Sequence, residues 1–101
     1  MLASFSIVPV GQGDALAEPV AEMIRIVERS GLPYRLGPME TTVEGELEQV
    51  LDLILSCHRR MRELHPRVHT SIAIDDREGA TGRLTGKVAE VEELLRKRGQ
   101  R

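Results

Sequence analysis

The sequence predicts an α+β protein of the ferredoxin-like type, a βαββαβ sandwich with an extra C-terminal helix and a four-stranded antiparallel sheet. Two eight-residue stretches (2–9 and 68–75) alternate as strands do, two short extended stretches lie between them, and amphipathic helical stripes separate these segments. Right-handed βαβ crossovers then place both main helices on one side of the sheet. At 101 residues, the whole chain (1–101) is predicted to form a single domain.

The first strand and the first helix are predicted within residues 2–31. Ser4 and Ser6 share one face of the strand, opposite apolar neighbours, and Pro9 ends the hydrogen-bonded ladder because it has no N–H. Residues 11–14 are predicted to form a loop that leads to a helix N-cap. The helix is expected to begin near residue 18, because Pro19 is tolerated only in a first turn, and Gly31 is its predicted C-cap.

Two short strands are predicted at 33–36 and 39–44, with Gly37-Pro38 between them as a turn or sharp bend. They either pair as a hairpin or continue as one bent strand, and a hairpin or a bulged equivalent is favoured. The second helix carries an apolar stripe from Leu47 to Leu64, with acidic residues early and basic residues late, as the helix dipole prefers. Pro66 ends it.

The last strand and a final helix complete the predicted order. One face of the strand at 68–75 carries Val68, Ile72 and Ile74. The other face carries His69, Ser71 and Asp75. Residues 76–82 are predicted to be a loop. The helix after it carries Leu84, Val88, Val91 and Leu95 on one face.

Composition and charge narrow the class of protein. A net charge of −2 argues against a nucleic-acid partner, which shows as a basic stripe. Cys57 is the one cysteine, which excludes an internal disulfide and suits a reducing compartment. No stretch reaches the roughly 18 apolar residues of a membrane span, and the first residues lack a signal-peptide layout. We therefore expect a cytoplasmic protein with neither a nucleic-acid nor a membrane partner.

The sheet face away from the two main helices is the predicted functional surface. Hydroxyl and charged side chains dominate it: Ser4, Ser6, Arg35, Glu40, Thr42, Glu44, His69, Ser71 and Asp75. Small hydroxyl residues let another sheet or a ligand approach closely, and carboxylates beside hydroxyls recognise the amino and ring-nitrogen groups of an organic cation. An ordinary hydrated face is the alternative to a subunit contact or a ligand surface.

Other chemistries have less support in the sequence. Glu44 and Asp75 are the candidate acid and base of an enzyme, but no nucleophile, orienting partner or cofactor loop has a recognisable spacing. The three histidines and Cys57 do not have a compact metal-ligand spacing. We therefore expect no catalytic residue, no metal site and no cofactor.

Four segments resemble the small thiamine-binding protein family in order and spacing: Ile7–Gly11, Ser30–Tyr34, Gly37–Gly45 and Arg67–Arg77. The specific parts are Pro-Met-x-Thr-x-x-Glu-Gly at 38–45 and Thr-Ser-Ile-x-Ile-Asp-x-Arg at 70–77. The resemblance implies a ferredoxin-like fold assembled as homodimers, usually paired into homotetramers through sheet contacts. It also implies binding of thiamine, or of its pyrimidine portion, without turnover.

The motif positions that the resemblance carries over are Thr41, Glu44, Ser71, Asp75 and Arg77. From these and the hydroxyls of the sheet face, we predict a ligand-binding set of Ser6, Thr41, Thr42, Glu44, Ser71 and Asp75. The carboxylates suit the positive thiazolium of thiamine, and the hydroxyls suit its aminopyrimidine.

This sequence departs from the family pattern at two positions. Glu40 stands where Gly is common, and Ala73 stands where a basic residue is common, so the pocket or its affinity is expected to differ. Ring stacking has few candidates, because only Phe5, Tyr34 or a methionine such as Met39 could provide it.

Two functional hypotheses follow. The first is a non-enzymatic cytoplasmic homo-oligomer that binds thiamine or its hydroxymethylpyrimidine moiety. The alternative is a structural or regulatory oligomer with no small-molecule ligand, whose sheet face serves only assembly.

Overall fold

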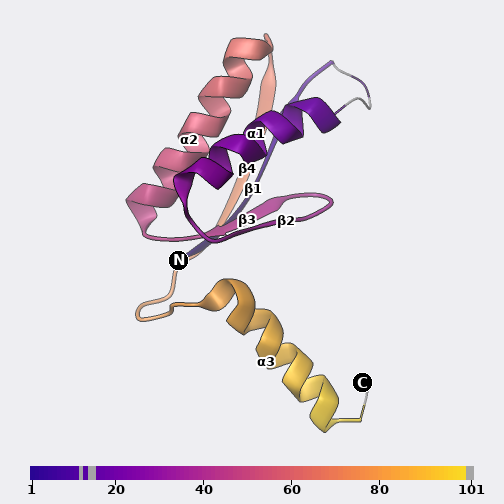
Figure 1. Ribbon diagram of the computed structural model, residues 1–101, viewed down its shortest axis with the longest axis vertical. Helices are drawn as coiled ribbons and strands as arrows, with labels where there is room; N and C mark the ends of the chain where they lie inside the picture. Colours follow the sequence, from indigo (N-terminus) through magenta and orange to yellow (C-terminus); the bar gives the residue numbers. More distant parts are fainter. Residues whose placement is uncertain (12, 14–15, 100–101) are drawn as a thin grey trace.

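A computed structural model of the chain describes residues 1–11, 13 and 16–99. Its elements are β1 (Leu2–Pro9), α1 (Ala17–Ser30), β2 (Tyr34–Leu36), β3 (Thr41–Glu44), α2 (Leu47–Leu64), β4 (Val68–Asp75) and α3 (Arg83–Lys97). The four strands form an antiparallel sheet in the order β2-β3-β1-β4 (Figure 1). This confirms the ferredoxin-like topology with an additional C-terminal helix.

The element boundaries follow the local sequence signals closely. β1 and β4 span the predicted residues, and β2 and β3 pair antiparallel, which confirms the hairpin. The turn is closed by a hydrogen bond from the N–H of Gly37 to the carbonyl of Glu40 (2.9 Å). Gly31 ends α1 with a φ of 74°, a left-handed conformation that glycine adopts without strain. The predicted loop and N-cap at 11–14 lie partly outside the described residues.

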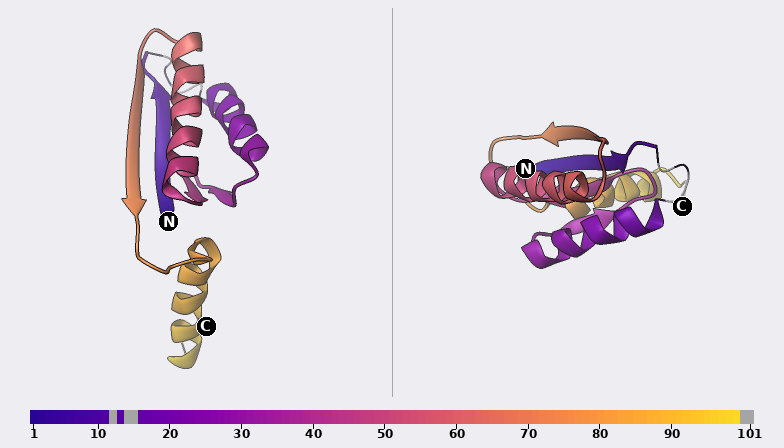
Figure 2. Two further views of the ribbon diagram at one scale, coloured as in Figure 1. Left: turned by 90° about the vertical axis from the view of Figure 1, so that its left-hand side faces the viewer. Right: turned by 90° about the horizontal axis from the view of Figure 1, so that it is seen from above.

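Helices α1 and α2 lie on the same side of the sheet, which we call the inner face (Figure 2). The core between them is aliphatic apart from one aromatic ring, and includes Phe5, Ile7, Met23, Val27, Val43, Val50, Ile54 and Met61. Burial of such side chains stabilises a fold by about 1.5–3 kcal/mol each. The opposite face of the sheet, the outer face, is left uncovered by these two helices.

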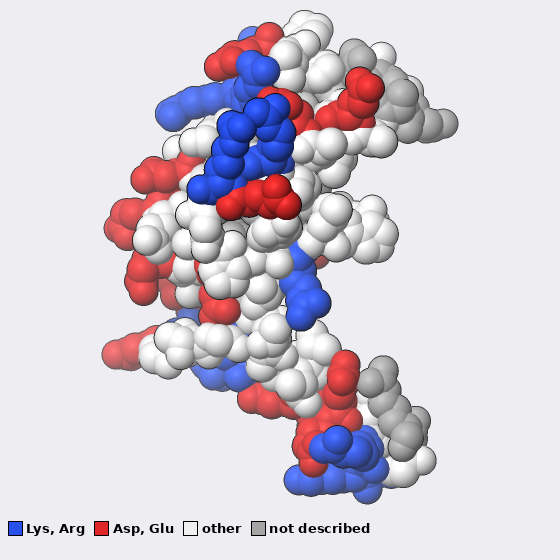
Figure 3. Space-filling view, viewed as in Figure 1, with Lys and Arg blue, Asp and Glu red and all other residues white. Residues whose placement is uncertain are grey.

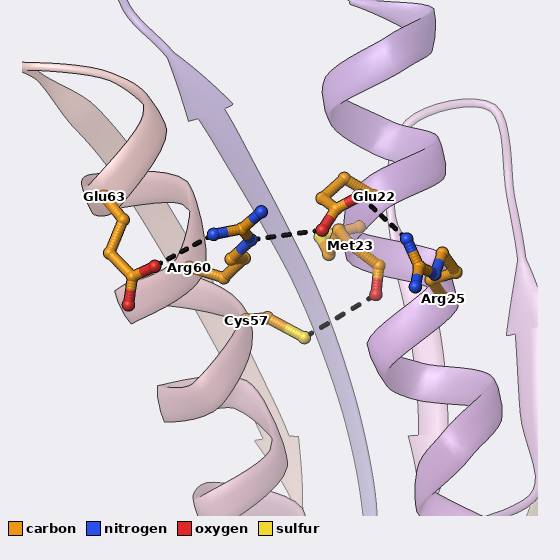
Figure 4. A network of polar contacts seen from close by, with 6 residues as sticks. All are labelled: Glu22, Met23, Arg25, Cys57, Arg60 and Glu63. Carbon is orange, nitrogen blue, oxygen red and sulfur yellow. Dashed lines mark hydrogen bonds and ion pairs between the residues drawn. The ribbon is translucent and has the colours of Figure 1, made fainter.

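Polar contacts at the surface reinforce the seam between α1 and α2 (Figure 4). Arg60 of α2 donates to Glu22 of α1 (Nε to Oε1, 3.1 Å) and to Glu63 one turn along its own helix (Nη1 to Oε2, 3.0 Å). Beneath them, Cys57 is fully buried, and its Sγ lies 3.9 Å from the carbonyl oxygen of Met23. Burial raises the pKa of the Cys57 thiol to about 11, so this cysteine behaves as a small apolar core residue.

β4 is one of the two edge strands, and its apolar residues are less covered than the sequence predicts. Ile72 and Ile74 stand opposite Phe5 and Ala3 and therefore belong to the inner face. They nevertheless remain 45% and 48% exposed, because α1 and α2 cover mainly the centre of the sheet.

Helix α3 projects beyond the end of the sheet and contributes no buried residue (Figures 1 and 2). In Figure 1, β2 and β3 run across the view, whereas β1 and β4 run more nearly along the long axis. This twist turns the outer face at β2 and β3 toward α3. No helix among the described residues is long and apolar enough to cross a membrane.

Candidate functional site

A groove of about 710 Å³ separates the outer face of the sheet from α3. Its sheet side includes Ser4, Arg35, Glu40, Thr42, Ala73 and Asp75. Its helix side includes Arg83, Leu84, Lys87, Val88 and Glu92, which recur at spacings that put them along one side of α3. The groove therefore joins the predicted polar face to a helix that sequence reasoning did not assign to the site.

Strand register explains the polar floor of the groove. Ser4 of β1 stands opposite Thr42 of β3 and Ala73 of β4, and Thr42 stands opposite Arg35 of β2. One row of small or polar side chains thus crosses all four strands. Because no bulky apolar residue interrupts the row, two hydroxyls are available at its centre.

A second row, one step toward the sheet end, holds α3 in place. Glu44 and Asp75 stand on either side of Leu2, each opposite it in the register. The carboxylate of Glu44 accepts the N–H of Arg83 (2.9 Å) and the N–H of Leu84 (3.2 Å), the first two residues of α3. The residue at the N-cap position of α3 is a glycine without a capping side chain, so Glu44 provides the cap from another element.

Asp75 binds the same helix one turn further along. Lys87 Nζ donates to Asp75 Oδ2 at 2.6 Å, so that α3 is bound to β4 as well as to β3. Leu2 beneath it is only 8% exposed although it lies on the outer face. We call the Glu44 and Asp75 contacts together the α3 clamp.

Both clamp carboxylates have depressed pKa values with identifiable causes. The N–H of Arg83 is the main cause that lowers the pKa of Glu44, and partial desolvation opposes it. The hydrogen bond from Lys87 is the main cause that lowers the pKa of Asp75. Both groups are therefore ionised and engaged with the protein itself near neutral pH.

The predicted ligand-binding residues fall into four places. Thr42 and Asp75 line the groove, and Glu44 lies behind it, bound to α3. Ser6 and Ser71 stand opposite each other further along the outer face, outside the groove lining. Thr41 is 1% exposed and stands opposite Phe5, so it faces the core.

Two acidic side chains line the groove without belonging to the clamp, Glu40 from the β2–β3 turn and Glu92 from α3. Glu40 is one of the two departures from the family pattern. Arg83 pairs with Glu90 through both terminal nitrogens (2.9 and 3.1 Å), which directs that guanidinium along α3. Glu40 and Glu92 thus add two carboxylates to a groove lining that also contains Arg35 and Lys87.

The stacking candidates do not reach the groove. Phe5 is buried on the inner face, the Tyr34 hydroxyl contacts Glu28 of α1, and Met39 is 88% exposed outside the lining. Aliphatic side chains take their place, with Leu84 and Val88 facing the floor. The apolar stripe on the last helix was the sequence signal for these two residues, but the pattern did not show what the stripe would face.

Outside the groove, the described residues line a second, mostly aliphatic hollow of about 560 Å³ between α1 and Leu36, and they form no metal centre. No three His, Cys, Asp or Glu side chains there are grouped to hold a metal ion. On the face seen in Figure 3, acidic and basic side chains are intermixed instead of forming a field of one sign. An extended single-sign surface, of the kind that binds nucleic acid, is not seen on that face.

Solved structures define the class of fold. A Methanocaldococcus jannaschii protein matches with a TM-score of 0.84 and 26% identity, over 91% of this chain and 95% of that chain. A Thermotoga maritima protein, whose name assigns it provisionally to thiamine biosynthesis or salvage, matches with a TM-score of 0.76 and 27% identity, over 87% and 96%. The molecule is an α+β protein of the same fold.

Sequence comparison then gives the family. The thiamine-binding protein family matches residues 3–92. A UPF0045 protein of Mycobacterium bovis is 38% identical over 96 residues, which is 94% of each chain, and one of Bacillus subtilis is 33% identical, over 93% of this chain and 96% of its own. The chain therefore belongs to the thiamine-binding protein family, as its motifs predicted.

Proposed function

We propose that this chain is a non-enzymatic cytoplasmic protein that binds thiamine, or its hydroxymethylpyrimidine moiety, as a homo-oligomer. The observation that carries this proposal is the groove between the outer face and α3, with two hydroxyls on its floor and two acids beside them. Membership of a family described by thiamine binding supports the same ligand.

The chemistry of the groove matches a cationic heterocycle. Its volume of about 710 Å³ lies within the roughly 300–1,000 Å³ typical of small-molecule sites. Ser4 and Thr42 can donate to and accept from an aminopyrimidine, and Glu40 and Glu92 offset the charge of a thiazolium. Leu84 of α3 offers an apolar surface to the ring faces.

Calorimetric titration with thiamine and with hydroxymethylpyrimidine tests the proposal. Ser4→Ala is expected to weaken binding of both compounds several-fold, whereas Ser6→Ala, the same change outside the groove, is expected to leave binding unchanged. Glu40→Gln is expected to weaken thiamine more than the uncharged pyrimidine. Absence of heat and of any thermal shift at millimolar ligand would end the proposal.

A structural or regulatory oligomer is the second candidate, and the edge strand favours it. β4 is eight residues long, and its outer edge pairs with no strand in the described residues, while Ile72 and Ile74 remain half-exposed. Long exposed edges pair readily with another chain.

Light scattering distinguishes assembly through the edge of β4 from assembly through the outer face of the sheet. Ile72→Lys puts a charge on the inner face of the edge strand and is expected to stop edge pairing. Ser6→Arg puts a bulky charge on the outer face. An oligomer that Ser6→Arg leaves intact would argue against assembly through the outer face.

A further inference from the structure

A small pocket of about 60 Å³ adjoins the groove at the first turns of α3. Its lining includes Leu2, Asp75, Arg77, Ala80, Arg83 and Lys87, so three basic side chains face one acidic side chain. Leu2, Asp75, Arg83 and Lys87 also line the groove, which makes the pocket a side chamber of the proposed ligand site. The wide groove is mixed in charge, whereas this chamber is basic.

The three basic side chains come from two directions. Arg83 and Lys87 lie one turn apart on α3, and Arg77 follows the end of β4. Lys87 is held by Asp75 at 2.6 Å, a single bond that leaves further donors on the ammonium group. Arg83 uses two nitrogens on Glu90, which lies outside the chamber.

Arg77 is the informative member of the three. Its guanidinium makes no hydrogen bond or ion pair with any described residue, although it is close enough to influence the carboxylates of Asp75 and Glu90. A guanidinium presents a planar fork of donors that fits two oxygens of a phosphate at once. The chamber therefore contains an unused anion-binding group.

Size restricts what the chamber can hold. A water molecule needs about 10–15 Å³ of such space, so 60 Å³ admits a group of a few non-hydrogen atoms and excludes a ring system. A tetrahedral oxyanion fits both the size and the charge. The rest of a molecule that carries this oxyanion then extends past Leu2 into the groove, since Leu2 lines both spaces.

We propose that the chamber binds the phosphate of a phosphorylated ligand, so that the preferred ligand class is a phosphate monoester of a cationic nitrogen heterocycle. This inference rests on the proposed function of the groove. The ring system occupies the wide groove between Ser4 and Leu84, and the phosphate contacts Arg77. Lys87, already neutralising Asp75, removes the repulsion that this carboxylate would exert on an anion.

Calorimetry with three probes tests this inference: thiamine, thiamine monophosphate and inorganic phosphate. The ester is expected to bind about tenfold more tightly than thiamine, and its affinity is expected to fall more steeply with salt. Arg77→Gln is expected to remove the difference between the two compounds by weakening the ester, without weakening thiamine. Arg77→Lys keeps the positive charge but not the planar guanidinium, and it is expected to retain part of the preference for the ester.

Arg67→Gln is the matched control, because it makes the same change before the other end of β4. It is expected to preserve the preference for the ester, and thermal unfolding verifies that every variant is folded. Equal affinity for thiamine and its ester would overturn the phosphate chamber and leave the proposed function standing. A preference for the ester that survives Arg77→Gln would also overturn it. Failure of thiamine, its ester and hydroxymethylpyrimidine all to bind would refute the proposed function itself.

Discussion

At the scale of single residues, Glu44 acts differently from its prediction as a ligand-binding carboxylate. Its carboxylate accepts two backbone N–H groups at the start of α3, from Arg83 and Leu84. Its place on the outer face follows from strand alternation, but its partners lie about 40 residues further along the chain. Local periodicity carries no information about such a contact, so the role could not be predicted from the sequence.

Glu44→Gln keeps one acceptor oxygen but replaces the other by an NH2 group, which cannot accept the second N–H. It is therefore expected to loosen α3 by about 1 kcal/mol, the usual cost of losing an N-cap hydrogen bond. Amide hydrogen exchange over residues 83–97 measures this loss directly. Glu78→Gln makes the same change in the connection before α3, where the side chain makes no hydrogen bond or ion pair with a described residue. Equal protection of α3 in both variants would show that the Glu44 bonds do not hold the helix.

The clamp also makes the position of α3 depend on pH. The pKa of Glu44 is lowered in the folded protein, so its contribution is fully present above the unfolded value of about 4.3 and is lost as the pH falls through the lowered folded value. Asp75 follows the same direction. The protection of the α3 amides, which is their exchange rate compared with the intrinsic rate at the same pH, is expected to fall below about pH 4, before the core unfolds. In Glu44→Gln the loss of α3 protection at low pH should be smaller. An identical loss in both proteins would contradict the role of Glu44 in this pH dependence.

At the scale of elements, regular patterns were predictable and relative positions were not. Alternation located β1 and β4, and the Gly37-Pro38 pair located the β2–β3 hairpin, because these signals are local. The stripe of Leu84 and Val88 likewise predicted α3 as an amphipathic helix. Which surface α3 would face depends on the twist of the sheet and on contacts distant in sequence, so the groove had no sequence signature.

Helix α3 has a weak point in its own sequence at Gly86. A Cβ there would meet only the Arg83 side chain at 3.5 Å, an ordinary contact. Gly86→Ala is therefore expected to stabilise α3 by about 1 kcal/mol, because alanine restricts the unfolded backbone more than glycine does. The measurement is helicity by far-ultraviolet circular dichroism.

Gly82→Ala is the matched control for Gly86→Ala, at the start of the same helix. Gly82 has a φ of 64°, so the added Cβ is strained there and helicity is expected to fall. Helicity that falls in both variants would mean that α3 does not tolerate a side chain at position 86.

At the scale of the whole molecule, the fold and the groove depend on different parts of the chain. The buried core cluster draws its residues from β1, α1, β3 and α2, and none of them comes from α3. The groove, in contrast, has α3 as one of its two walls. Stability and ligand binding are therefore expected to separate when α3 is removed.

Deletion of residues 77–101 tests this separation. The truncated chain is expected to unfold cooperatively, because the main structural loss is the cover over Leu2, worth about 2 kcal/mol of the roughly 5–15 kcal/mol that stabilise a domain. Thiamine binding is expected to be abolished, since Leu84, Val88 and Glu92 are gone. Thermal unfolding and calorimetric titration measure the two effects side by side.

Deletion of residues 98–101 alone, beyond the end of α3, should change neither. A truncated chain that binds thiamine as tightly as the full chain would move the ligand site away from the groove, and one that fails to fold would show that α3 belongs to the stable core.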